Sequence, residues 1–182
     1  MKKYIFILFA VAISAVAQAQ QYSKATLQAT GLTCALCSNA INKSLLQLPF
    51  VESVKSEIKT SSFAVEFKES ADVSIDEIKK AVEDAGFSVG KLEMTGKFDN
   101  VEVEKDAHVT IGDDVYHFLN AGKKNLNGEQ TITLADKGFL SAKQFKKVSG
   151  ASKMKCVQSG KAESCCSEAG VKPGTRVYHV TL

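Results

Sequence analysis

Two cysteines near the start of the chain have the spacing of a metal-binding or redox pair. Cys34 and Cys37 lie in residues 31–37, which read GLTCALC, where a loop is expected to lead into a helix. The helix N-terminus favours negative charge, so both thiols should ionise readily. Thiolates select soft ions such as Cu(I), and Zn(II) to a lesser extent. Two ligands leave one side of an ion open, which suits a carrier that passes its ion to another thiol protein.

The same spacing leaves two alternatives open. Thiol–disulfide oxidoreductases also use a CxxC motif, so exchange chemistry at Cys34 and Cys37 is the competing function. In an exported chain the two residues could also form a permanent disulfide. We favour the metal-binding interpretation, in which no catalysed reaction is expected.

A second cysteine group lies far along the chain, in residues 149–172. This segment is rich in Ser, Gly, Ala and Lys, and its lack of apolar periodicity predicts a flexible excursion. It holds Cys156, Cys165 and Cys166, with Met154 nearby. Adjacent cysteines bridge each other poorly, so Cys156 could pair with either of the other two. The alternative is a second soft-metal site.

The count of cysteines and histidines limits these options. The chain has five cysteines, an odd number, so at least one thiol is unpaired or bridges another molecule. Its histidines are His108, His117 and His179, spread over predicted strands without helical spacing. We therefore expect each of them to be a packed or surface residue rather than a ligand.

The pattern of residues 22–90 predicts the elements that position the first cysteine pair. An alternating strand from Ala25 precedes a helix that Pro49 ends. Two strands in residues 51–67 form a predicted hairpin, and the sequence from Ser74 to Glu77 is a capping box that starts a second helix. A last strand begins near residue 87. This order is the ferredoxin-like βαββαβ sandwich.

Residues 23–91 resemble the heavy-metal-associated domain of copper chaperones, copper-transporting P-type ATPases and mercury-binding proteins. The resemblance rests on residues 31–37 and on residues 78–87, which read IKKAVEDAGF. It implies that Cys34 and Cys37 are metal ligands and that Phe87 lies beneath the metal loop. The family usually has Met where this chain has Leu32, which should pack inward in its place. Cu(I) is the implied cargo, with Hg(II), Zn(II) and Cd(II) as alternatives.

Residues 91–182 show a different pattern, of short β-type runs separated by turn signals such as residues 112–114. One short helix is expected at residues 141–147. We therefore predict an α+β protein in which a heavy-metal-associated domain, residues 20–90, precedes a small mostly-β domain, residues 91–182. A partly open oligonucleotide/oligosaccharide-binding type of barrel is one candidate for the second domain.

The first residues predict export. Lys2 and Lys3 precede an apolar run in residues 4–16, followed by Ala-Gln-Ala at residues 17–19. This is the pattern of a secretory signal cleaved after residue 19, so a periplasmic or secreted protein without a stable membrane anchor is expected. The net charge of +3 does not indicate nucleic-acid binding. The expected partners are a metal-transporting ATPase or another thiol-containing metal donor or acceptor.

Overall fold

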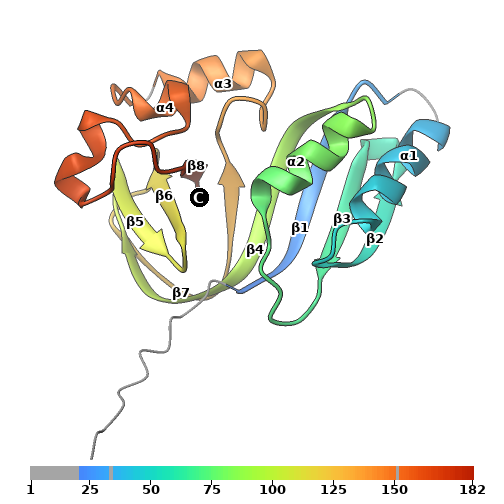
Figure 1. Cartoon of the computed structure of the whole chain (residues 1–182), viewed down its shortest axis with the longest axis horizontal. Coiled ribbons are helices and arrows are strands. Elements are labelled where there is room, and N and C mark those ends of the chain that lie inside the picture. Colours follow the sequence, from blue (N-terminus) through green and yellow to red (C-terminus); the bar gives the residue numbers. More distant parts are fainter. Residues whose placement is uncertain (1–20, 33–34, 151) are drawn as a thin grey trace, which may run out of the picture.

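The computed structural model describes residues 21–32, 35–150 and 152–182. Its first half has the predicted element order: β1 (Gln21–Thr30), α1 (Ala35–Leu46), β2 (Val51–Glu57), the 3-10 turn η1 (Ile58–Thr60), β3 (Ser62–Phe67), α2 (Ile75–Asp84) and β4 (Ser88–Val103). The strands pair antiparallel in the order β2-β3-β1-β4. In Figure 1, α1 and α2 lie together over these strands. The ferredoxin-like arrangement is therefore confirmed for this half.

Local sequence explains where α2 begins and ends. The Ser74 side chain accepts a hydrogen bond from the Glu77 backbone N–H, as the predicted capping box requires. Asp76 and Glu77 place negative charge in the first turn, where the helix dipole favours it. The helix stops before Gly86, whose φ of 87° is a left-handed conformation that glycine adopts without strain. The inward face of α2 is apolar, and it buries Ile75, Ile78, Ala81 and Val82.

The second half extends the same sheet. Its elements are β5 (Ala107–Ile111), β6 (Asp114–Phe118), β7 (Lys124–Leu134), α3 (Ala142–Ser149), α4 (Cys156–Ser159), the 3-10 turn η2 (Ser164–Ala169) and β8 (Val177–Thr181). The eight strands follow the order β2-β3-β1-β4-β7-β8-β6-β5. The strands of this half thus continue the sheet of the first half, with β5 at its edge, and among the described residues no strand pairing closes them into a separate barrel. The helix expected near residue 141 is present, with Ser141 as its N-cap.

The predicted domain boundary after residue 90 falls inside a continuous strand. β4 runs through Gly90 for 16 residues, pairing first with β1 and then with β7. A Cβ at Gly90 would lie 2.7 Å from Cγ2 of Thr30, close to a register shift between β1 and β4. This glycine therefore permits a close approach of two strands at a bulge and does not end the element.

The two halves also share a hydrophobic core. The main buried cluster contains residues of the first four strands together with Tyr116, Phe118, Tyr178 and Val180 of β6 and β8. Tyr22 of β1 donates a hydrogen bond of 2.8 Å to the Tyr116 hydroxyl. Arg176 in turn joins the loop before β8 to Asp76 of α2 through contacts of 2.9 and 3.1 Å. Burial and paired charges therefore link the first half of the chain to the second.

The described part of the segment expected to be flexible, residues 149, 150 and 152–172, is folded. In it, α4, η2 and the turn between them bury Cys156, Val157, Ala162 and Cys166 in a second hydrophobic cluster. The sequence lacks helical periodicity here because these are single short turns, too brief to show a repeat. Among the described residues, no helix is both long and apolar enough to cross a membrane. The expected leader, residues 1–19, lies outside the described residues.

Candidate metal centres

Cys37 lies in the first turn of α1, where the sequence places it. Ile41 and Leu45 anchor this helix in the core, and the first turn contains no acidic residue. The backbone N–H groups at this end of the helix have no carboxylate there to compete with a thiolate. Cys34 and Thr33 lie outside the described residues. The structure therefore gives the position of one member of the predicted pair.

The residues beside this turn are arranged as the sequence predicts. Leu32 is partly buried and packs against the main core, so leucine does serve as the inward-pointing residue. Phe87 packs against the same core, and its Cδ1 atom lies 3.9 Å from the position of a Cβ at Gly31. Leu36 is 80% exposed. Leu32 and Phe87 thus pack between this turn and the core, while Leu36 extends from the turn into solvent.

Comparison with protein-family models decides what this half of the chain is. Residues 26–88 match the model of the heavy-metal-associated domain. Residues 26–88 are a heavy-metal-associated (HMA) domain. The match runs from the middle of β1 through α1 and α2 to the first residue of β4, and it includes Cys37 and Phe87. A search of curated proteins found no match to the chain.

Solved structures similar to the chain align with it over roughly the extent of one small domain. Apo-CopP from Helicobacter pylori is 35% identical, and the alignment covers 36% of this chain and 97% of that one, with a TM-score of 0.33. The yeast copper transporter domain Ccc2a is 32% identical, with coverage of 36% and 88% and a TM-score of 0.33. A copper-binding domain from HMA7, a P-type ATPase, is also 32% identical, with coverage of 36% and 86% and a TM-score of 0.33.

Outside the HMA domain, all three histidines of the chain lie in one row across neighbouring strands. His108 of β5 pairs directly with His117 of β6, and His117 pairs with His179 of β8. The rings of His108 and His117 stack with their centroids 4.3 Å apart, while His179 meets His117 edge-on at 5.0 Å. Residues opposite each other on paired strands point to the same face of a sheet. The register therefore gathers three imidazoles on one face.

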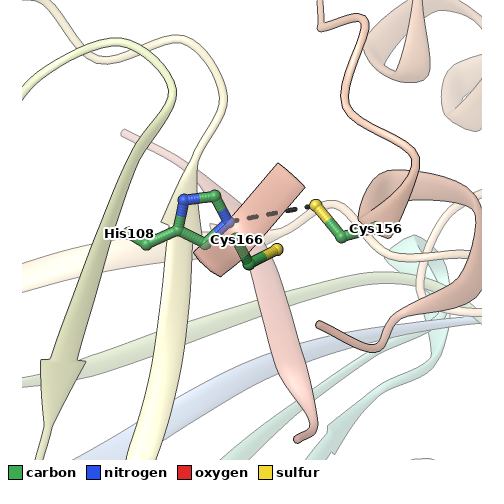
Figure 2. A group of neighbouring side chains, drawn as sticks. All are labelled: His108, Cys156 and Cys166. Carbon is green, nitrogen blue, oxygen red and sulfur yellow. Dashed lines mark hydrogen bonds between the residues drawn. The ribbon is translucent and has the colours of Figure 1, made fainter. Parts of the chain in front are cut away.

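Two thiols cover this row of histidines. Cys156 of α4 places its Sγ atom 3.9 Å from Nε2 of His108 and 3.8 Å from Nδ1 of His117. Cys166 of η2 approaches the same point, and Figure 2 shows the side chains of His108, Cys156 and Cys166 converging from three elements. We call these five residues the His/Cys cluster: His108, His117, His179, Cys156 and Cys166.

The cluster contains two sets of three side chains whose ligand atoms lie within 4.8 Å of one another. One set is His108, Cys156 and Cys166, and the other is His117, Cys156 and His179. Cys156 belongs to both sets. Cys165, the third member of the predicted group, is a free thiol whose Sγ atom lies 3.7 Å from that of Cys166. The disulfides considered from Cys156 to Cys165 or Cys166 are not formed, because all three thiols are free.

Two aspartates lie behind the buried histidines. Asp136, itself buried, places Oδ1 2.6 Å from Nδ1 of His179. Asp106 places Oδ1 3.3 Å from Nε2 of His117, although the two atoms are not aligned as a hydrogen bond. In each ring the aspartate faces one nitrogen. A carboxylate behind a histidine orients the ring and raises the basicity of its other nitrogen.

Burial controls the charge of the cluster. Burial, followed by repulsion from the neighbouring imidazoles His108 and His179, lowers the pKa of His117 to about 4. Burial is also the main reason that the pKa of His108 is lowered and that the pKa values of Cys156 and Cys166 are raised. These shifts favour the neutral forms of the His108 and His117 imidazoles and of the Cys156 and Cys166 thiols.

The sequence contained part of the signal for this arrangement. His108 and His117 lie at equal distances from the turn at residues 112–113, so a tight hairpin there places them opposite each other. The expectation that each histidine is a separate packed or surface residue overlooks this symmetry. The positions of His179 and Cys156 depend on the parallel pairing of β6 with β8 and on the fold of α4, for which no short sequence pattern exists.

Proposed function

We propose that this is an exported protein that binds a soft metal ion, Cu(I) first, through the thiolates of Cys34 and Cys37. The observation that carries the proposal is the position of Cys37 in the first turn of α1 within an HMA domain. The helix end supplies N–H groups that stabilise a thiolate, the form of cysteine that binds metal. Soft thiolate ligands then favour Cu(I) over harder ions.

Transfer by ligand exchange follows from the small number of ligands. An ion held by two thiolates stays open to attack by the thiolates of another protein, so it can move without being released into water. The exposed Leu36, between the two cysteines in sequence, offers apolar surface next to the ion for such a partner. The partner that fits this exchange is a metal-transporting ATPase or another thiol-containing donor or acceptor.

Export is the second part of the proposal. The basic start, the apolar run and the small residues at 17–19 support a signal cleaved after residue 19. In this picture residues 20–182 work in the periplasm or outside the cell. Sequencing the N-terminus of protein recovered from the periplasm or the medium tests this part, and a chain that still begins at Met1 contradicts it.

The test of metal binding is a Cu(I) titration of reduced, metal-free protein. To remove the His/Cys cluster from the count, the starting variant carries Cys156→Ser and Cys166→Ser. We expect it to bind about one Cu(I) per chain, and we expect the further substitutions Cys34→Ser and Cys37→Ser to abolish this binding. Circular dichroism confirms that both variants are folded. Unchanged binding after the last two substitutions would refute the proposal.

The competing function, thiol–disulfide exchange, gives a different result in a separate assay. A carrier does not turn over, so we expect the full chain to leave the rate of insulin reduction by dithiothreitol unchanged. Acceleration that depends on Cys34 and Cys37 would favour the oxidoreductase instead.

A further inference from the structure

We propose that the His/Cys cluster is a second, buried metal site, which binds one closed-shell cation, Zn(II) or Cu(I), in the second half of the chain. The juxtaposition that carries this inference is three histidines from three strands facing two cysteines from two short helical turns. The site uses no residue of the HMA domain. It stands or falls independently of the proposed function.

The side-chain types select the class of ion. Imidazole suits zinc and copper among other metals, whereas thiolate selects Cu(I), zinc and iron–sulfur clusters. Zinc and copper are common to both sets. Magnesium and calcium prefer oxygen ligands, and the two aspartates that supply oxygens here lie behind the histidines.

The distances fit an ion placed between the atoms. With metal–sulfur bonds of about 2.3 Å and metal–nitrogen bonds of about 2.0–2.1 Å, a sulfur and a nitrogen on one tetrahedral ion lie roughly 3.5–3.6 Å apart. The Sγ atom of Cys156 lies 3.8 Å from Nδ1 of His117 and 3.9 Å from Nε2 of His108. Only a small movement is therefore needed to bring these atoms onto one ion.

A nitrogen without a partner supports the same conclusion. The side chain of His179 is fully buried, its Nδ1 faces Asp136, and its Nε2 has no hydrogen-bond partner among the described residues. Leaving a buried polar atom unpaired is unfavourable, because the atom loses its hydrogen bond to water. A ring nitrogen of His179 lies within 4.8 Å of the ligand atoms of Cys156 and His117. A metal ion there would give the unpaired nitrogen a ligand bond.

Nucleophilic chemistry does not explain the cluster as well. The side chains of Cys156, His117 and Asp106 contact one another in the order expected of a nucleophile, a base and a carboxylate. However, Cys156 is fully buried, and burial raises its pKa, so its thiolate is disfavoured. A reactive cysteine needs an accessible thiolate. A cation that displaces the thiol proton would stabilise the thiolate in place, and each bound cysteine releases one proton to solvent.

The decisive experiment uses the full chain carrying Cys34→Ser and Cys37→Ser, which removes the HMA thiols without changing the cluster. The reduced, metal-free protein is titrated with Zn(II) and, separately, with Cu(I), each against a competing chelator. In at least one of the two titrations we expect about one ion to bind per chain and the melting temperature of the protein to rise. Failure to bind either ion overturns the proposal, whatever the result for Cys34 and Cys37.

Histidine variants in that background locate the bound ion. The set with two thiols suits Zn(II), and the set with one thiol suits Cu(I). His108→Asn is therefore expected to reduce bound Zn(II), and His179→Gln bound Cu(I), at least about tenfold at a fixed chelator concentration, because each removes one ligand of that set. The matched control is Cys165→Ser, which should keep full stoichiometry because Cys165 belongs to neither set of ligand atoms. If a histidine variant fails to fold by circular dichroism, Cys156→Ser, which removes the ligand common to both sets, replaces it. Retained binding of the matching ion in the folded variant places the ion elsewhere and refutes the site.

Discussion

Asp136 joins His179 to Arg176: its Oδ1 lies 2.6 Å from Nδ1 of His179, and its Oδ2 accepts a hydrogen bond of 3.2 Å from the Arg176 guanidinium. The same Oδ2 accepts a second hydrogen bond from the backbone N–H of His179. The carboxylate thus fixes both the backbone and the ring of His179, which lies at one end of the row of histidines. Arg176 in turn reaches Asp76 of the HMA domain.

Replacing Asp136 should weaken the second metal site without removing a ligand. In Asp136→Asn the amide cannot supply the charge that orients His179, and losses of about 10–100-fold in metal affinity are typical for such partners. The measurement is a chelator competition with Cu(I), whose ligand set contains His179, in the Cys34→Ser/Cys37→Ser background. Asp99→Asn, at an exposed site, is the matched control. An affinity that stays within about twofold of the parent would show that Asp136 does not act on the site.

The substitution Cys166→Ser should change the affinities for Zn(II) and Cu(I) by different amounts. The set of His108, Cys156 and Cys166 supplies two thiolates, which balance the charge of Zn(II), whereas the set of His117, Cys156 and His179 supplies one thiolate, which balances Cu(I). Since an unbalanced charge is costly in a buried site, the substitution should weaken Zn(II) at least about tenfold and leave Cu(I) within about threefold. The affinities are compared in parallel titrations. Equal losses for both ions would mean that they share one ligand set.

Arg176→Met should destabilise the metal-free protein. The guanidinium neutralises the buried Asp136 and also binds Asp76, and its loss leaves a buried carboxylate without its cation. Breaking such a pair from one side costs about 3 kcal/mol of unfolding free energy. Urea denaturation measures the change. Lys24→Met removes an exposed pair with Glu129 and should cost less than about 1 kcal/mol. Similar losses in the two variants would contradict this account.

Replacing the carboxyl of Asp114 should stabilise the fold at neutral pH. Burial raises its pKa above the ordinary 3.8, while a hydrogen bond from the Tyr116 hydroxyl at 3.3 Å opposes the shift. A carboxyl whose pKa is higher in the folded state makes the fold less stable as the pH rises above 3.8, because the unfolded chain ionises first. Asp114→Asn removes this effect and should unfold at higher urea than the parent at neutral pH.

The same variant should lose its advantage in acid. Near pH 3 the carboxyl is protonated in both folded and unfolded chains, so parent and variant should have about equal midpoints. Asp113→Asn, the exposed neighbour, is the control and should follow the parent at both pH values. A gain for Asp114→Asn of the same size in acid would show that its cause is not ionisation.

The HMA domain was predictable because its signals are local. The apolar repeat of α1, the capping by Ser74 and the pattern CxxC each occupy a few consecutive residues, and each corresponds to one element. The domain limit after residue 90 was placed where the local pattern changes. A change of pattern does not show whether a strand continues, and only the structure shows that β4 runs through Gly90 at a bulge beside Thr30.

The amino-acid sequence by itself determined the βαββαβ order of the first half and the position of Cys37 at the start of a helix. It also determined the hairpin that sets His108 opposite His117. Only the tertiary structure decided that β8 returns beside β6 and brings His179 into the row, and that α4 places Cys156 over it. These contacts join residues many positions apart. They depend on which surfaces the chain buries together, and no short stretch of sequence encodes that.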